Sequence, residues 1–261
     1  MTLEQWINNL QAKGKYTFLR GEAINGSGLS PDAVKKALQR LARRGRVVKV
    51  KDYFYVIVPL EYASAGAPPA SWFIHDLMAA MRLPYYVGLL SAAGHHGASH
   101  QQPQEFQVVT DRSIRPLVVA RTRIQFFASK YVRQAAALEV KTPTGMMRVS
   151  TPETTAVDLV RFAKAAGHLD HVAIVLTDLA HLLDAKRLLE AVRAVGDVPN
   201  VQRLGFILDV VQERRLTGPL HAWVQRQHAH AVRLRPGRPI IGARLDRRWQ
   251  VLINGPIEAE A

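Results

Sequence analysis

Apolar residues recur at helical spacing near the start of the chain and then give way to β-branched runs. The spacing predicts a helix at residues 3–12, a short extended segment at residues 16–18 and a second helix at residues 19–24. A third helix is predicted between Ser30 and Gly45. Ser30 can cap its first turn, Pro31 suits the first helical position, and Asp32 favours the positive end of the helix dipole.

β-branched and aromatic residues dominate the stretch after Gly45. Residues 46–50 and 53–58 form two such runs, separated by Lys51-Asp52, and this pattern predicts a β-hairpin. The glycine-rich residues 25–28 predict the turn between the second and third helices. Helix, turn, helix, glycine and hairpin is the order of a winged helix-turn-helix, whose recognition helix enters the DNA major groove.

Periodicity is lost over residues 59–71, where Ala, Gly, Ser and Pro gather. We therefore predict a winged helix-turn-helix domain at residues 1–60, a linker at 61–71 and a larger domain at 72–261. In the larger domain strands precede most of the helices, which predicts a mixed α+β fold. The helices expected there cover residues 72–82, 85–93, 152–165, 171–183, 185–195, 201–213 and 220–228, and the strands cover 105–110, 116–120, 123–127, 138–141, 146–149, 238–242 and 249–254.

Positive charge is concentrated in two parts of the chain. The formal net charge is +14, of which residues 1–60 and 201–250 carry +7 each. A basic block that coincides with a helix-turn-helix pattern favours nucleic acid as the partner. With no cysteine, disulfides and thiolate metal sites are excluded. No apolar run approaches the roughly 18 residues of a membrane span and the amino terminus lacks a secretory pattern, so we expect a cytoplasmic protein.

The basic face of the third helix supplies the candidate DNA contacts. Lys36, Gln39 and Arg43 are expected to reach base edges, because Gln pairs with adenine and Arg or Lys with guanine. The remaining candidates are expected to position the protein on the backbone, mainly through phosphates. They are Ser30, Lys35, Arg40, Arg44, Arg46, Lys49 and Lys51.

The second basic block has no motif to explain it. Three interpretations stay open: further DNA contacts, contact with an RNA or nucleotide, or a solvated surface. The arginines that define this second basic patch are Arg233, Arg235, Arg238, Arg244, Arg247 and Arg248.

The acidic residues and histidines are the candidates for a metal or catalytic site. A magnesium-dependent nuclease would need converging carboxylates, and Glu105, Asp111, Glu153 and Asp158 are the candidates. Glu153 falls in a first helical turn, and no lysine follows Glu105 at short spacing to complete a nuclease-like motif. The histidines, which are His95, His96, His100, His168 and His171, have no cysteine or well-placed carboxylate beside them. We expect no catalytic residue, no metal and no cofactor.

Several strings, in matching order along nearly the whole chain, resemble one family. They are residues 54–59, 85–93, 96–98, 104–110, 150–159, 203–205 and 248–254. The chain resembles the AbiE-type abortive-infection regulators, the antitoxins of type IV toxin–antitoxin systems. The resemblance implies a cytoplasmic, two-domain protein that binds inverted repeats in its own promoter and counters a nucleotidyltransferase-like toxin without a stable complex. The wing turn departs from the family pattern, because Lys51-Asp52 stands where a basic residue and glycine are expected.

Three hypotheses follow from these observations. The first is a DNA-binding repressor of its own operon that is also an antitoxin, with no catalysis. The second is a metal-dependent nuclease or other nucleic-acid enzyme that a winged helix directs to its target. The third is a ligand-sensing transcription factor without a toxin partner.

Overall fold

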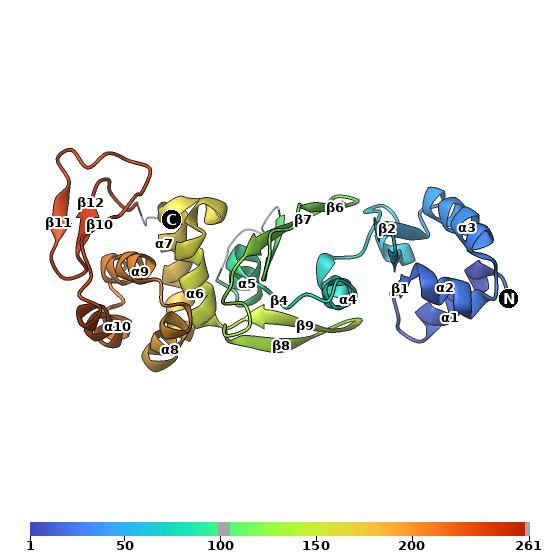
Figure 1. Cartoon of the computed structure of the whole chain (residues 1–261), viewed down its shortest axis with the longest axis horizontal. Coiled ribbons are helices and arrows are strands. Elements are labelled where there is room, and N and C mark those ends of the chain that lie inside the picture. Colours follow the sequence, from blue (N-terminus) through green and yellow to red (C-terminus); the bar gives the residue numbers. More distant parts are fainter. Residues whose placement is uncertain (99–104, 259–261) are drawn as a thin grey trace. The chain divides into compact units, whose positions relative to one another are not determined.

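A computed structural model describes residues 1–98 and 105–258 of the chain (Figure 1). Contacts divide the chain into two compact units. The first comprises Met1–Tyr86, Gln104–Lys130 and Glu139–Arg148, and the second comprises Val87–Pro103, Tyr131–Leu138 and Val149–Ala261. Helices and strands are both abundant, and this confirms the predicted α+β class. The predicted linker falls inside the first unit, and its role as a domain boundary stays a prediction.

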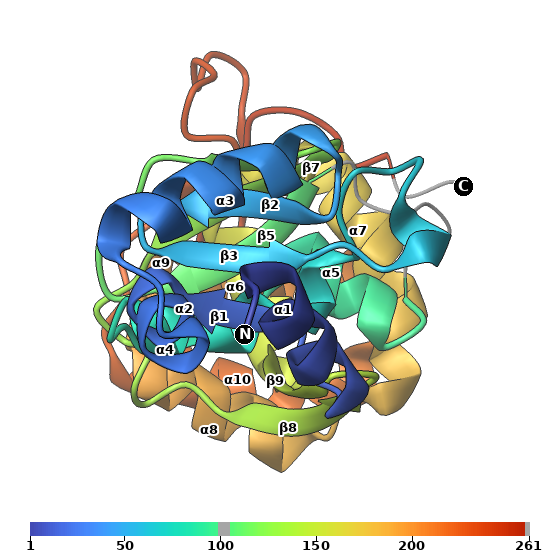
Figure 2. The same ribbon diagram turned by 90° about the vertical axis from the view of Figure 1, so that its right-hand side faces the viewer.

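The amino-terminal elements have the order of a winged helix (Figure 2). They are α1 (Leu3–Ala12), β1 (Thr17–Leu19), α2 (Arg20–Ser27), α3 (Pro31–Arg43), β2 (Val47–Lys51) and β3 (Phe54–Ile57). The three strands form one antiparallel sheet in the order β1-β3-β2. The predicted helices and hairpin are confirmed, although α2 extends beyond its expected end at residue 24.

The wing turn lies one residue later than predicted. Lys51 still belongs to β2, and the turn is formed by Asp52 and Tyr53. The pairing passes from Lys49↔Tyr55 directly to Lys51↔Phe54, with an irregularity between Lys49 and Lys51. A bulge of this kind places an extra residue on one strand and shifts the turn along the chain, which alternation alone does not reveal.

The first unit also holds most of a six-stranded sheet. Its order is β6-β7-β5-β4-β9-β8, with β4–β9 and β5–β7 parallel and β6–β7 antiparallel. Helix α4 and two single-turn 3-10 helices, η1 and η2, precede it. The bounds are η1 Leu60–Tyr62, η2 Ala70–Trp72, α4 Ile74–Ala80, β4 Tyr85–Val87, β5 Glu105–Thr110, β6 Leu117–Val119, β7 Thr122–Ala128, β8 Ala137–Thr142 and β9 Gly145–Ser150.

One predicted helix is wrong. Residues 85–93 were expected to be helical throughout, but Tyr85–Val87 is strand β4 and helix α5 (Leu89–His95) begins only after Gly88. Tyr and Val suit a pleated surface, and all three residues of β4 are buried. Gly88 has extended backbone angles (φ −132°, ψ −170°), which separate the strand from the helix.

The second unit is mainly helical. Its larger helices are α6 (Pro152–Arg161), α7 (His168–Leu179), α8 (Ala185–Val195), α9 (Val198–Val210) and α10 (Arg214–Arg226), with η3 (Ala163–Ala166) and η4 (Ala180–Leu182) between them. Helix α10 begins six residues before the predicted start at residue 220, because Pro219 lies inside it rather than ahead of it. Among the described residues, no helix combines the length and the apolarity needed to cross a membrane.

The last three strands of the described chain form a small sheet. It has the order β10-β12-β11, formed by β10 (Val232–Arg233), β11 (Arg244–Asp246) and β12 (Val251–Ile253). The predicted strand at residues 238–242 is wrong. Ile240 and Ile241 are exposed, Ile241 at 94%, and Pro239 lacks the N–H that a sheet ladder needs. The β-branched pair therefore lies in a loop.

Candidate nucleic-acid interface

Helix α3 presents one buried and one open face. Val34, Ala37, Leu38 and Leu41 are buried in the winged-helix core, as their spacing predicts. The polar side chains around the rest of the helix are exposed. These are Lys35, Lys36, Gln39, Arg40, Arg43 and Arg44. The three predicted base-reading residues therefore lie on one accessible helix.

Both ends of α3 are fixed by local hydrogen bonds. The hydroxyl of Ser30 accepts from the Ala33 N–H at 3.3 Å, so Ser30 is the N-cap. At the other end Gly45 is left-handed (φ 68°), and the Gly45 and Arg46 N–H groups donate to the carbonyls of Ala42 and Leu41 at 3.0 and 2.9 Å. The glycine stop predicted at Gly45 is confirmed, and the axis of the basic helix is set from both ends.

Arg46 has a structural role within the winged helix. Its guanidinium is half-buried and donates to Asn8 Oδ1 at 3.0 Å, and more weakly to Gln11 and to the Val58 carbonyl, both at 3.4 Å. These bonds connect α1 to the end of the wing. Since its donors are used inside the domain, we remove Arg46 from the expected phosphate contacts.

The wing carries a weaker basic surface than its composition suggests. Lys49 is exposed, but its ammonium lies 3.1 Å from the Asp52 carboxylate. Lys51 is only partly exposed. An exposed ion pair of this type is worth little in stability, but it lowers the positive charge that the wing offers a phosphate. The basic face of α3 is therefore the stronger part of the interface.

Gly26 sets how closely α1 and α2 pack. A Cβ on Gly26 would lie 2.0 Å from Nε1 of Trp6, a contact that no side chain allows. Trp6 in turn packs edge-on against Phe18, which stacks on Tyr55. Gly26, predicted to lie in the turn, is inside helix α2 and serves packing there. Sequence reasoning missed this requirement because it links residues twenty positions apart.

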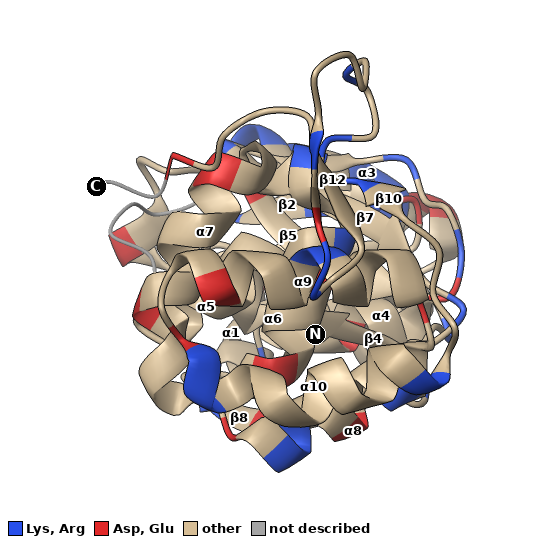
Figure 3. Ribbon diagram, turned by 90° about the vertical axis from the view of Figure 1, so that its left-hand side faces the viewer, with Lys and Arg blue, Asp and Glu red and all other residues tan. Residues whose placement is uncertain are grey.

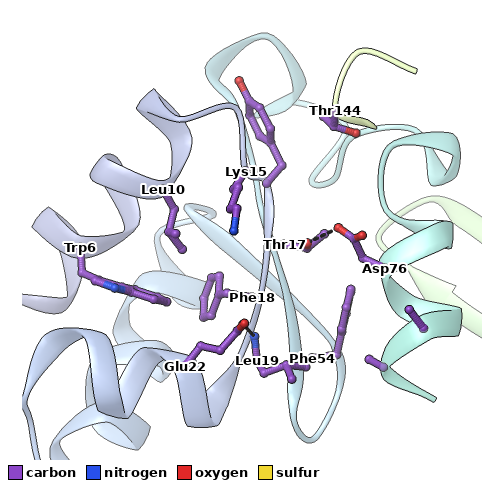
Figure 4. A pocket seen from close by; sticks show the side chains of 13 residues that line it. Trp6, Leu10, Lys15, Thr17, Phe18, Leu19, Glu22, Phe54, Asp76 and Thr144 are labelled. Carbon is purple, nitrogen blue, oxygen red and sulfur yellow. Dashed lines mark hydrogen bonds between the residues drawn. The ribbon is translucent and has the colours of Figure 1, made fainter. Parts of the chain in front are cut away.

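A pocket of ≈ 440 Å³ adjoins the winged helix (Figure 4). Aromatic residues such as Phe18 and Phe54 line it together with Asp76 and Glu22. The Thr17 hydroxyl donates to Asp76 at 2.5 Å, and Glu22 accepts from the Leu19 N–H at 2.6 Å. Both carboxylates already accept hydrogen bonds, and we assign no ligand to this pocket.

The second basic patch does not form one free surface. Figure 3 shows Lys and Arg around the β10–β12 region, but the structure gives these arginines different environments. Arg233, Arg238, Arg244 and Arg247 are exposed, whereas Arg235 and Arg248 are partly buried. Arg235 donates to the Asp170 carboxylate and to the Pro256 carbonyl, both at 2.6 Å. Arg235 is thus a link between α7 and the segment after β12.

Arg248 belongs to a cluster around Trp249. The buried Trp249 indole donates to Asp209 at 2.6 Å, and the Thr217 hydroxyl donates to the other carboxylate oxygen at 3.0 Å. Arg248 lies 3.4 Å from Asp209 and donates to Thr217 at 3.0 Å. We call Asp209, Thr217, Arg248 and Trp249 the tryptophan cluster. It joins α9, α10 and the last strands, and sequence reasoning did not anticipate it.

Arg235→Ala is expected to lower the free energy of unfolding by about 1–2 kcal/mol at neutral pH, because a charge-assisted hydrogen bond is lost from a partly exposed carboxylate. Arg244→Ala removes an exposed arginine and is the matched control, with a change within about 0.5 kcal/mol. Urea denaturation followed by circular dichroism measures both. Equal effects of the two substitutions would contradict a structural role for Arg235.

The ion pair between Arg235 and Asp170 predicts that the free energy of unfolding depends on pH. Burial raises the pKa of Asp170, but the hydrogen bonds from Arg235 and from the Glu258 N–H outweigh it, so the pKa is lowered. A lowered carboxyl pKa stabilises the fold above its unfolded value of about 4 and loses that contribution as the pH falls through the folded value. The difference in the free energy of unfolding between wild type and Arg235→Ala should therefore become smaller below about pH 4.

The carboxylates considered for a nuclease lie in structural positions. Glu153 and Asp158 are 3% and 1% exposed. Glu153 accepts from the Asp184 N–H at 3.2 Å, and Asp158 pairs with Arg161 at 3.0 Å. Glu105 pairs with Arg123 at 2.8 Å and Asp111 with Arg112 at 3.1 Å. Each of the four thus accepts a bond from its own surroundings.

Two of the candidate histidines lie within hydrogen-bond distance of backbone carbonyls. His96 Nε2 lies 2.8 Å from the Ser150 carbonyl, and partial burial lowers the pKa of His96, which favours its neutral form. His171 Nδ1 lies 2.8 Å from the Ala166 carbonyl. His100 lies outside the described residues, as does Gln104 of the family-like string. Within residues 1–98 and 105–258 no group of three or more His, Asp or Glu could hold a metal ion.

Comparisons with known proteins identify part of the chain. No curated protein matches it. The crystal structure of RV2827C protein from Mycobacterium tuberculosis matches with a TM-score of 0.66 at 15% sequence identity, covering 97% of this chain and 91% of that chain, and this likeness shows a shared fold. The family model of the AbiEi antitoxin C-terminal domain matches residues 86–210. The predicted resemblance to AbiE-type antitoxins is thereby confirmed over residues 86–210.

Proposed function

We propose that this chain is a DNA-binding repressor of its own operon and the antitoxin of a type IV toxin–antitoxin system. The antitoxin role follows from the family domain at residues 86–210. The exposed basic face of α3 is the single observation that supports DNA binding. Lys36, Gln39 and Arg43 lie on this helix, whose ends are fixed and whose other face is buried. A helix held in this way suits the major groove.

The partners follow from the same proposal. Double-stranded promoter DNA with inverted repeats is the first, and a nucleotidyltransferase-like toxin, opposed without a stable complex, is the second. The protein acts in the cytoplasm and contributes no catalysis, cofactor or metal. The hydrogen-bonded carboxylates Glu153 and Asp158 support this choice over a nuclease, since they are almost fully buried.

Arg43→Ala is expected to weaken binding to the promoter about 5- to 150-fold, the range of one good base contact, without unfolding the domain. Fluorescence anisotropy with labelled promoter DNA measures the change. Arg193→Ala is the matched control, because it removes an exposed arginine from α8 in the second unit. Unchanged promoter affinity of Arg43→Ala at moderate salt would contradict the proposed orientation of α3.

A salt titration of the same complexes distinguishes contacts to DNA phosphates from contacts to base edges. Each phosphate contact contributes about 0.9 to the slope of log affinity against log salt. The phosphate contacts that we retain are Lys35, Arg40, Arg44, Lys49 and Lys51, and Ser30 stays at the helix start as the cap. Substituting one retained contact should reduce the slope by about that amount and weaken all sequences equally.

A further inference from the structure

Strand β8 (Ala137–Thr142) is one end of the six-stranded sheet that the described residues form. Leu138, Glu139 and Lys141 on it are exposed. The opposite end, β6, is short, follows Pro116 and is flanked by Arg115 and Arg121, all of which discourage pairing with another strand. Strand β8 is longer and carries one negative and one positive side chain instead.

The backbone groups of β8 that point away from β9 can be identified. A two-residue turn, Pro143 and Thr144, joins β8 to β9. The N–H of Thr151, just after β9, donates to the carbonyl of Ala136, just before β8, at 3.1 Å. The backbone groups of even-numbered residues in this strand therefore point towards β9. Backbone groups alternate in direction along a strand. Ala137, Glu139 and Lys141 therefore direct their N–H and C=O groups outward from the sheet.

These outward groups limit how two copies of β8 can pair. In an antiparallel pair only outward-facing residues can stand opposite each other and exchange hydrogen bonds. If Glu139 faced Glu139, or Lys141 faced Lys141, like charges would oppose each other directly. The register centred on Val140 avoids both, because it places Glu139 of each copy opposite Lys141 of the other.

We propose that two copies of this chain pair antiparallel through β8, with Val140 on the two-fold axis and Glu139 opposite Lys141 on each side. The contact is isologous, so the same residues serve both copies. It is also small, and we expect a weak dimer that DNA strengthens by bringing two copies together. Its relevance to inverted repeats rests on the proposed function, since two-fold DNA sites match two-fold proteins.

The absence of cysteine from the chain allows a direct test. In this register the two Val140 residues form a pair without mutual hydrogen bonds, with Cα atoms about 4.5 Å apart, within disulfide range. Two Thr142 residues would lie about 13 Å apart. Full-length Val140→Cys, oxidised without DNA, should form at least about ten times more covalent dimer than Thr142→Cys. Circular dichroism confirms that both variants are folded.

Charge reversal in the Val140→Cys background tests the register. Glu139→Lys places lysine opposite Lys141 and should suppress the covalent dimer, whereas Glu139→Lys combined with Lys141→Glu should restore it. Equal cross-linking of Val140→Cys and Thr142→Cys, or failure of the double reversal to restore the dimer, would overturn the proposal. Since no DNA is present, that outcome leaves promoter binding by a single copy untouched, and promoter affinity of wild type is measured separately.

Discussion

Trp249→Ala should lower the free energy of unfolding by about 3–5 kcal/mol, the range for loss of a fully buried aromatic side chain. The Trp249 ring is fully buried, and its indole N–H donates to Asp209 at 2.6 Å. Removing the ring leaves a cavity and takes one hydrogen-bond donor from the partly buried Asp209 carboxylate. Urea denaturation followed by far-ultraviolet circular dichroism measures the loss.

A glycine pair provides the controls for this prediction. A Cβ on Gly205 would lie 2.2 Å from the Trp249 ring, whereas a Cβ on Gly218 of α10 meets nothing within 4 Å. Gly205→Ala should therefore destabilise by about 1–3 kcal/mol through overpacking, and Gly218→Ala should be neutral or slightly stabilising. If both glycine substitutions had the same effect, the close packing of α9 against Trp249 would be refuted.

The second large effect concerns the two activities of the proposed repressor and antitoxin. Lys36→Ala combined with Arg43→Ala should reduce promoter affinity by at least about 100-fold, because two groups that reach base edges are lost together. Because the AbiEi domain at residues 86–210 is unaltered, protection from the toxin should persist when the variant is expressed from an unrelated promoter. A promoter–reporter assay and a growth assay measure the two activities separately.

Lys186→Ala combined with Arg193→Ala is the matched control, since it removes one exposed lysine and one exposed arginine from α8. It should leave repression intact. Loss of toxin protection in the α3 variant, with its fold preserved, would show that antitoxin activity depends on DNA binding and would contradict the proposed separation.

The winged helix could be predicted from the sequence because its signals are local. Ser30, Pro31 and Gly45 fix one helix through contacts within a few residues, and the apolar spacing of α3 identifies its buried face. The wing turn was displaced by one residue because the bulge between Lys49 and Lys51 depends on pairing with β3. A local sequence pattern does not show how two strands pair, so it could not predict this bulge.

The roles of the arginines could not be predicted in the same way. Arg46, Arg235 and Arg248 look like surface charges in the sequence, but each is held by residues far along the chain. The family-like strings at residues 203–205 and 248–254 show the same limit, because Gly205 is explained only by its contact with Trp249. Charge and motif counts identify such residues, and only tertiary contacts assign their role.

Guanine methylation tests most directly whether α3 reads promoter DNA from the major groove, as we propose. Methylation at N7 blocks the major-groove edge that an arginine contacts. We predict that N7 methylation at specific guanines in the promoter repeats prevents binding of the wild-type protein, and that Arg43→Ala loses this sensitivity at one position in each repeat. Binding that tolerates methylation at every guanine, or that is no tighter than to a scrambled sequence of equal length, would contradict the claim.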